Sequence, residues 1–305
     1  MRAVMRIAAA LVLAVTLSAC FSPPPPSADG RTPIWIDTDV SIGEPDGDVA
    51  DGFALLQAFR SDTVVVRGVS AVHGQTPLVR TWPIAQDLVK RFGPEGLRPW
   101  RGAAGAHELQ APTEASEALA TALRAEPLTI VALGPVTTIA TALQRDPALR
   151  SRVVGIVLAM RDAHVGLDAA AMQIVLESGV PLTILPVTAA SGVHLTDADL
   201  ARLDGGAADA RFLAESARAR RRAAPDTPDS EVEVDAIQLF ETLAIDVVAA
   251  PGRFTCVSSH ASTEGDSEPV LVVREGAGTR AVTLCHTPDE GFKERLLETL
   301  TMPDA

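Results

Sequence analysis

The chain has 305 residues, of which 47% are hydrophobic, 21% are charged and 4% are aromatic. This composition excludes a disordered chain, a collagen-like fibre and a multi-span membrane protein. The formal net charge of −13 argues against nucleic acid as a partner, because neutralising phosphates needs a basic surface. Scattered carboxylates keep a surface soluble, whereas clustered carboxylates indicate a cation site.

Residues 1–19 have the features of an export signal. Two arginines precede the apolar run Ile7 to Leu17, which is too short for an ordinary membrane-spanning helix. The run ends in Leu17-Ser18-Ala19-Cys20, which resembles a bacterial lipobox, where the cysteine is lipidated and becomes the first mature residue. We therefore expect an exported protein, anchored through Cys20 to a bacterial membrane and facing the periplasm or the cell exterior. The alternative is an ordinary secretory signal cleaved near Ala19.

The next segment is rich in proline. Residues 20–32 include FSPPPPSADG, which is suited to a stiff, extended spacer. The predicted order is therefore signal peptide 1–19, linker 20–32 and one globular domain over 33–305.

Strand-like and helix-like segments alternate through most of this domain. Five apolar, β-branched runs predict strands at 34–36, 64–72, 128–133, 153–158 and 182–187. Helices are predicted at 50–59, 77–92, 113–125, 137–143 and 169–177. This alternation predicts an α/β fold, with an open, mostly parallel, Rossmann-like sheet and helices on both faces. Ligands of such sheets gather at the carboxyl ends of the strands.

The end of the chain has a different pattern. Short strands are predicted at 255–259, 269–273 and 281–284, followed by a helix over 289–300, so we expect a small C-terminal antiparallel extension. Cys256 and Cys285 lie in these strands, and the sequence leaves open whether they form a disulfide or remain two free buried thiols.

An Ala/Arg-rich stretch, 205–233, precedes this extension and contains four arginines between positions 218 and 222. We interpret it as a solvated helix that runs into a mobile loop. A lid or a contact with anionic headgroups is the alternative.

An acidic loop follows the first predicted strand. Between Asp37 and Asp51 the chain carries six carboxylates, a density that needs a cation or solvent to relieve repulsion, and hard divalent cations prefer oxygen ligands. An EF-hand does not fit. With Asp46 and Asp48 at loop positions one and three, Asp51 stands where glycine is required.

The loop instead resembles the signature of nucleoside hydrolases, the N-ribohydrolases of the inosine–uridine-preferring type. The family pattern is an apolar strand, Asp-x-Asp, a Gly-containing loop, Asp-Asp and an apolar helix start. Here Asp37-Thr38-Asp39 is similar to the first pair and Asp51-Gly52-Phe53-Ala54-Leu55 to the helix start. Further similar segments follow in the same order, so the resemblance covers about residues 33 to 300; they are at 68–76, 131–140, 177–187, 195–200 and 239–254.

The resemblance implies a metal-assisted hydrolysis of nucleosides to ribose and free base. It implies Ca²⁺ as cofactor, Asp39 as both general base and metal ligand, and Asp51, the Leu133 backbone carbonyl and Glu241 as further ligands. Glu241 takes the position of a family Asp, and Asp235 is a weaker rival for that role. Asp37 is expected to orient Asp39 from behind.

The resemblance also implies a nucleoside or related ribosyl compound as substrate, with Gln75, His73 and Asp48 as candidate substrate-binding residues. His73 alternatively is a hydrogen-bonded loop histidine. Gln75 replaces the usual Asn, and Ala50 replaces the Asp that contacts ribose, for which Asp46 or Asp48 is the candidate substitute. The sequence is compatible with an oligomer.

Two further departures lie elsewhere in the chain. Phe240 stands where the inosine–uridine type has a His that protonates the leaving base. After Met160 the family has a longer insert that holds the ribose hydroxyls, which this chain lacks. We interpret Asp162 and His164, which follow Met160, as exposed turn residues in preference to site residues.

Three functions are therefore carried forward. They are a nucleoside hydrolase, a related hydrolase with an altered substrate, and a catalytically degenerate binding lipoprotein on the same scaffold.

Overall fold

The computed structural model describes residues 29–44, 47–74, 76–223, 237–265, 269–274, 276 and 280–303. The predicted signal peptide, most of the linker with Cys20, and Gln75 lie outside this part of the chain. Among the described residues, no helix has the length and apolar character needed to cross a bilayer.

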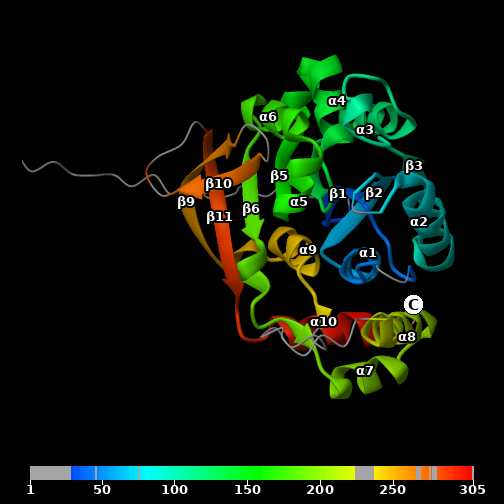
Figure 1. Ribbon diagram of the computed structural model, residues 1–305. Coiled ribbons are helices and arrows are strands. Elements are labelled where there is room, and N and C mark those ends of the chain that lie inside the picture. Colours follow the sequence, from blue (N-terminus) through cyan, green and yellow to red (C-terminus); the bar gives the residue numbers. More distant parts are fainter. Residues whose placement is uncertain are drawn as a thin grey trace, which may run out of the picture.

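A nine-stranded sheet forms the centre of the molecule (Figure 1), in the order β10-β9-β11-β6-β5-β4-β1-β2-β3. Strands β1 to β6 pair in parallel, which confirms the mostly parallel α/β sheet. The pattern of apolar runs missed β3, because Pro99-Trp100-Arg101 contains no β-branched residue. The strands are β1 (Thr32–Thr38), β2 (Val64–Ala71), β3 (Pro99–Arg101), β4 (Leu128–Ala132), β5 (Val153–Met160), β6 (Leu182–Pro186), β9 (Phe254–Glu264), β10 (Val270–Arg274) and β11 (Arg280–Pro288).

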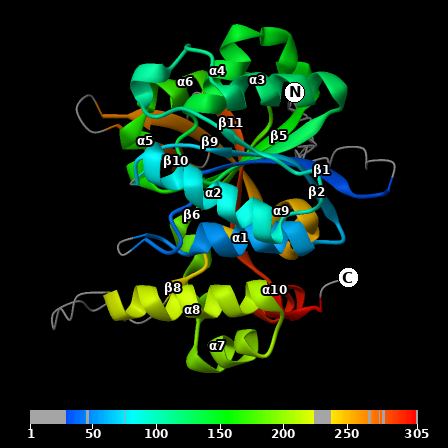
Figure 2. The same ribbon diagram turned by 90° about the vertical axis from the view of Figure 1, so that its right-hand side faces the viewer.

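Helices cover both faces of this sheet, so its strands are buried on both sides and read as continuous apolar runs. Along β1, Ile34 and Ile36 enter one hydrophobic core while Trp35 enters the other. The first core is closed by α1 (Ala50–Arg60), α2 (Leu78–Phe92) and α9 (Thr242–Ala249), and the second by α3 (Glu114–Ala125), α4 (Thr137–Arg145) and α6 (Ala169–Glu177). Figure 2 shows the two groups of helices above and below the sheet.

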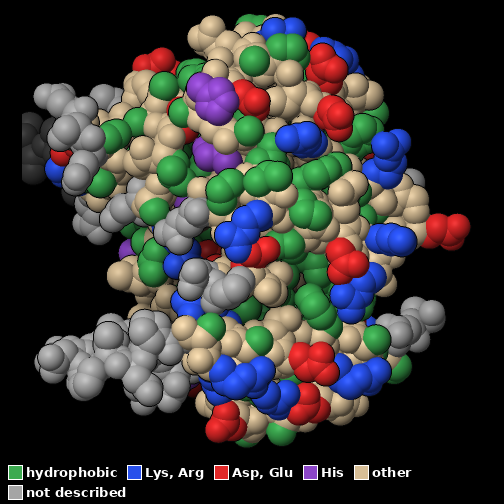
Figure 3. Space-filling view, turned by 45° about the vertical axis from the view of Figure 1, so that its right-hand side comes forward, with side chains coloured by type: hydrophobic (Ala, Val, Ile, Leu, Met, Phe, Trp, Pro, Cys, Tyr) green, Lys and Arg blue, Asp and Glu red, His purple; other side chains and the backbone are tan. Residues whose placement is uncertain are grey.

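A further layer lies beyond α1 and consists of α7 (Asp197–Asp204), α8 (Ala208–Ala223) and α10 (Phe292–Thr301). Arg60 of α1 forms an ion pair with Asp209 of α8 and fixes this layer to the rest of the molecule. Two arginines of the Arg-rich stretch pair with acidic residues of α7, Arg218 with Asp204 and Arg221 with Asp197, both at 2.6 Å. Figure 3 shows basic and acidic side chains intermixed over this layer. These pairs favour the interpretation as a solvated helix, and residues 224–236 lie outside the described part.

The C-terminal extension is antiparallel, as expected. Strand β11 pairs in parallel with β6, and β9 then pairs antiparallel with both β11 and β10. Cys256 and Cys285 are direct partners in the β9–β11 register and form a disulfide, which settles the alternative left open by the sequence.

The remaining elements lie around the edges of the sheet. Strands β7 (His194–Leu195) and β8 (Ile237–Gln238) form a separate antiparallel pair, and α5 (Asp162–Leu167) follows β5 directly. Because β2, β1, β4 and β5 are neighbours and parallel, their carboxyl ends meet at one edge of the sheet. The loops that follow these four ends carry His73, Asp39, Leu133 and Arg161.

Candidate active site

Asp37 is the second-last residue of strand β1 and is fully buried. Its Oδ1 accepts a hydrogen bond from the hydroxyl of Ser70 on β2, and the Ser70 oxygen in turn accepts one from the Trp35 indole at 2.9 Å. Burial raises the pKa of Asp37 to about 7, although the Ser70 hydrogen bond opposes this shift. This chain of contacts fixes the end of β1, and the orienting role predicted for Asp37 stays a prediction.

Asp39 is held where two neighbouring loops approach it closely, and only 8% of the residue is exposed. A Cβ added at Gly74 would lie 1.6 Å from Asp39 Oδ2, and one added at Gly134 would lie 2.9 Å from Asp39 Oδ1. Both positions therefore need glycine, because any other side chain would displace the carboxylate. Gly134 directly follows Leu133, so the Leu133 peptide lies next to Asp39, and the ligand role of the Leu133 carbonyl stays a prediction.

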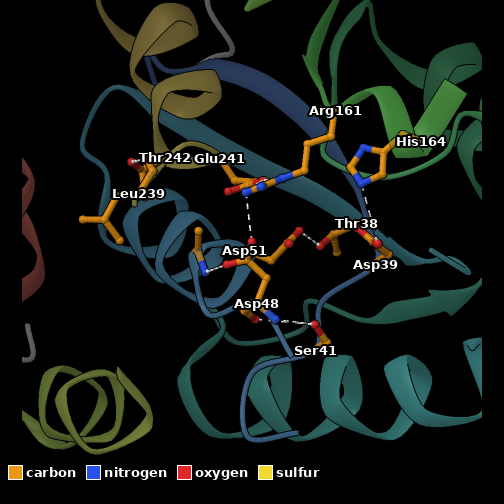
Figure 4. Close-up of polar contacts among 11 residues, drawn as sticks. Thr38, Asp39, Ser41, Asp48, Asp51, Arg161, His164, Leu239, Glu241 and Thr242 are labelled. Carbon is orange, nitrogen blue, oxygen red and sulfur yellow. Dashed lines mark hydrogen bonds and ion pairs between the residues drawn. The ribbon is translucent and has the colours of Figure 1, made fainter. Parts of the chain in front are cut away.

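Asp51 and Glu241 come from the starts of two helices on the same face of the sheet. Asp51 lies in the first turn of α1 and accepts a hydrogen bond from the Thr38 hydroxyl. Glu241 directly precedes α9, in a turn where the Thr242 hydroxyl donates to the Leu239 carbonyl at 2.5 Å. Figure 4 shows both carboxylates pointing toward the region where Arg161 and Asp39 lie.

Arg161 reaches into this group of carboxylates from the end of β5. Its Nε and Nη2 atoms lie 2.9 and 2.8 Å from Glu241 Oε1, and its Nη2 donates to Asp48 Oδ2 at 2.9 Å. The guanidinium carbon lies 5.5 Å from the centre of the Phe240 ring. The sequence analysis assigned no role to Arg161. A basic residue directly after a buried strand, at the edge where the acidic residues gather, was the signal available.

Asp48 faces this network from the β1–α1 loop. One of its carboxylate oxygens accepts from the Ala50 backbone N–H at 2.9 Å and the other accepts from Arg161. Asp48 was predicted to bind substrate in place of the Asp lost at position 50. In the structure its carboxylate holds the loop and Arg161, and Ala50 itself is fully buried.

The buried carboxyl groups raise the pKa values of one another. Burial, followed by repulsion from Glu241, raises the pKa of Asp39 to about 7. Burial also raises the pKa of Asp51 and of Glu241 well above the usual range, with added repulsion from Asp39 and Asp48 respectively. For Arg161, burial lowers the pKa, but attraction to Glu241 and Asp48 outweighs it, so the guanidinium stays charged.

His164 corrects one expectation. It was interpreted as an exposed turn residue, but only 5% of it is exposed, and its Nε2 lies 3.8 Å from Asp39 Oδ2. The reason is that α5 starts immediately after β5 and turns this face inward (Figure 4). Burial, followed by repulsion from Arg161, lowers the pKa of His164 to about 4, so the imidazole is neutral at pH 7.

His73 is also buried, and its Nδ1 lies 3.2 Å from the Ala103 carbonyl oxygen. Burial lowers its pKa. This contact fits the hydrogen-bonded loop histidine of the sequence analysis, and it leaves Nε2 without a partner among the described residues. Gln75, Asp46 and Asp235, and the side chain of Asp162, lie outside the described part of the structure.

The donor set, as arranged, does not fit a calcium ion. Ca²⁺ takes six to eight oxygen ligands at about 2.3–2.6 Å. Here Arg161 occupies Glu241 Oε1 and one Asp48 oxygen, and the Thr38 hydroxyl occupies Asp51 Oδ1. Within the described ranges, no three acidic, histidine or cysteine side chains are grouped so that they could hold a metal ion.

Comparison with known proteins identifies the family. The model of the inosine-uridine preferring nucleoside hydrolase family matches residues 34–297. The chain belongs to this family. Its fold is the mostly parallel α/β fold, with a small antiparallel part at the C-terminus, that nucleoside hydrolases share.

The following relatives of this nucleoside hydrolase family member have low sequence identity to it. Over 213 residues it is 28% identical to "Probable uridine nucleosidase 1" of Oryza sativa subsp. japonica, a match that covers 57% of this chain and 64% of the rice protein. The chain thus spans less than two thirds of that relative's length. The solved structures of a plant nucleoside hydrolase, PpNRh1, and of a purine-preferring ribonucleoside hydrolase from Gardnerella vaginalis superpose with TM-scores of 0.74 and 0.72. They are 18% and 16% identical, and the matches cover 89% and 88% of this chain and 98% of each of theirs.

Proposed function

We propose that this protein hydrolyses the N-glycosidic bond of a nucleoside or a related ribosyl compound, with Asp39 as general base. The observation that carries the proposal is the Asp39 carboxylate itself. It is fixed between Gly74 and Gly134 at the carboxyl edge of the sheet, and burial and Glu241 raise its pKa to about 7. A general base works best when its pKa lies near the operating pH.

The reaction consumes one water molecule. The water oxygen forms a bond to the anomeric carbon of the sugar, its proton moves to Asp39, and the carbon–nitrogen bond breaks. The base leaves with the bonding electrons and takes up a proton, so the products are ribose and free base. The transition state carries positive charge on the sugar. Asp39, Asp51 and Glu241 each stabilise this charge in their ionised form.

The residues available to recognise the sugar differ between this chain and the nucleoside hydrolase family pattern. Ala50 is fully buried and makes only a backbone contact to Asp48, so position 50 supplies no carboxylate to a ribose. His73 and Gln75 flank Gly74 and remain the candidates for substrate contact from the β2 loop. An altered sugar or base is therefore part of the proposal.

The resemblance implies Ca²⁺ as cofactor, whereas the donor set as arranged does not fit that ion. The chemistry above needs no step through a metal.

A panel of purine and pyrimidine nucleosides, with release of reducing sugar as the readout, tests the proposal. We expect release with at least one nucleoside and a loss of about 10²- to 10⁴-fold in the Asp39→Asn variant, since a positioned base contributes that much. The matched control is Asp87→Asn, a carboxylate whose ion pair with Arg91 lies on the surface of α2. Release that persists in Asp39→Asn would refute the mechanism.

A binding lipoprotein without hydrolysis is the second candidate, and one specific observation favours it. Arg161 spans Asp48 and Glu241 and fills part of the space between the carboxylates. Calorimetric titration with the same nucleosides distinguishes the two functions. Binding that leaves the nucleoside intact after prolonged incubation supports the binding protein, whereas free base in the mixture supports the hydrolase.

We also propose that the protein is exported and anchored through lipid on Cys20. The Cys256–Cys285 disulfide supports an oxidising compartment, because disulfides persist there and are rare in the cytosol. The test is the distribution of wild type and Cys20→Ala between membrane and soluble fractions. Wild type is expected in the membrane fraction and the variant in the soluble fraction.

A further inference from the structure

We propose that Arg161 is a built-in cation that takes the place of a divalent metal, so that the active site is complete without one. The inference concerns the same site and rests on the proposed function. It assigns to Arg161 the positioning of the buried carboxylates that a metal ion would otherwise hold.

The contacts of Arg161 tie two separate stretches of the chain together. Its guanidinium donates from Nε and Nη2 toward Glu241, at the start of α9, and from Nη2 to Asp48, in the β1–α1 loop. These are charge-assisted hydrogen bonds of 2.8 to 2.9 Å, the distance range expected for a guanidinium and a carboxylate. One residue thereby sets the relative positions of loop and helix, as a shared metal ion would.

The Glu241 side chain needs a cation at this place. It is only 2% exposed, and a buried carboxylate without a compensating partner is strongly unfavourable. Arg161 lies directly against it, and the side chain of Arg161 is itself only 28% exposed. The Phe240 ring, 5.5 Å from the guanidinium carbon, adds a cation–π contact from the residue next to Glu241. The position where the family has a leaving-group His thus supports the arginine in this chain.

A metal and this arginine would share the carboxylates of Glu241 and Asp48, of which Glu241 Oε2 has no hydrogen-bond partner among the described residues. Glu241 Oε1 and one Asp48 oxygen already accept hydrogen bonds from Arg161, and an arginine does not lose its charge in a protein. For Ca²⁺ to use Glu241, the guanidinium would have to leave both partners, or the two cations would have to share one carboxylate at close range. Both outcomes are unfavourable.

The charge balance also suits the proposed reaction. Asp39, Asp51, Asp48 and Glu241 outnumber the single guanidinium. The surroundings become negative once two of these carboxyl groups are ionised, as a positively charged sugar in the transition state requires.

The experiment measures Ca²⁺ binding and uses no enzymatic activity. Wild-type protein is stripped with chelator and then titrated with CaCl₂ in a calorimeter. Its melting temperature is recorded with and without about 5 mM CaCl₂, a concentration above the dissociation constants of weak extracellular Ca²⁺ modules. The same measurements are made on Arg161→Met, which keeps the apolar stem and removes the charge. Arg67→Met is the control, because Arg67 of β2 forms an ion pair with Glu126 in which about a third of each side chain is exposed.

We expect no binding heat and no shift in melting temperature for wild type and for Arg67→Met. Arg161→Met should melt several degrees lower in the absence of Ca²⁺ and should recover when Ca²⁺ is added. If Arg161→Met does not fold, Arg161→Lys keeps a charge but cannot span both carboxylates, and it should show the same decrease and recovery to a smaller extent.

Two results would overturn the inference. One is stoichiometric Ca²⁺ binding by wild type together with a raised melting temperature. The other is a folded Arg161 variant whose stability does not respond to Ca²⁺. Either result leaves the proposed hydrolysis untouched. Conversely, a wild type that binds no Ca²⁺ and releases no sugar would refute the proposed function but would agree with the role inferred for Arg161.

Discussion

Replacing Gly74 with alanine should displace the general base. The added methyl carbon would lie 1.6 Å from Asp39 Oδ2, whereas carbon and oxygen that are not bonded approach to roughly 3.2 Å. The carboxylate therefore has to move by about 1.5 Å. A displacement of about 1 Å in a catalytic group is enough to lower the rate by about 100-fold. We expect kcat/KM to fall by at least that factor, measured as sugar release from the best nucleoside of the panel.

A graded series of glycine variants makes this prediction specific. Gly134→Ala brings its carbon to 2.9 Å from Asp39 Oδ1, so it should cause a smaller loss. Gly252→Ala places the methyl group where no atom lies within 4 Å and should leave kcat/KM unchanged. Gly252→Ala should melt near wild type. Gly74→Ala and Gly134→Ala should melt lower, because their added carbons also lie 2.6 Å from Asp39 Cβ and 3.1 Å from the Asp39 backbone nitrogen, so kcat/KM is compared at a temperature at which all three are folded. Full activity in Gly74→Ala would refute the assignment of Asp39.

Three further predictions concern pH and stability. The value of kcat/KM should rise with pH and level off above an apparent pKa of about 7, because burial and Glu241 raise the pKa of Asp39 to that value and only the ionised form accepts the proton; a profile that is flat from pH 5 to 9 would contradict this. Burial raises the pKa of Asp37 to about 7, so the stability that the protonated side chain gives wild type below pH 3.8 is lost as the pH rises through 7. Asp37→Asn should therefore raise the free energy of unfolding by at most about 4 kcal/mol at pH 8 and change it little at pH 3. Urea denaturation at the two pH values measures this difference, and an equal effect at both would argue against a buried charge. Replacing Cys256 and Cys285 together by serine should lower the free energy of unfolding by about 3–4 kcal/mol, the loop-closure value for their separation of 29 residues; no loss in urea denaturation would show that the disulfide is not formed.

Much of the fold could be predicted from the sequence because both faces of the sheet are covered. Strands such as Val153–Met160 are then apolar throughout and are easy to recognise. The short edge strand Pro99–Arg101 was missed because its residues are only partly buried and carry no such pattern. The extension that contains Cys256 was predicted as antiparallel, but its pairing with β6 through β11 depends on contacts across the fold.

The site was predicted in part. Asp37, Asp39 and Asp51 lie between the end of one strand and the start of the next helix, so a local motif indicated them. Arg161 and His164 were not found, because their roles depend on where β5 ends relative to β1 and α9, and no local pattern expresses that. The residues around His164 are also of the types found in turns, and only tertiary packing buries its side chain.

The central claim is that an acidic site balanced by its own arginine hydrolyses nucleosides without a metal. The most direct measurement is the rate of sugar release by wild-type protein that has been stripped of metal and kept in excess chelator, compared with the rate in added Ca²⁺. We predict equal rates under both conditions and a loss of release in Asp39→Asn. Release that stops in chelator and returns with Ca²⁺, or no release from any nucleoside, would contradict it.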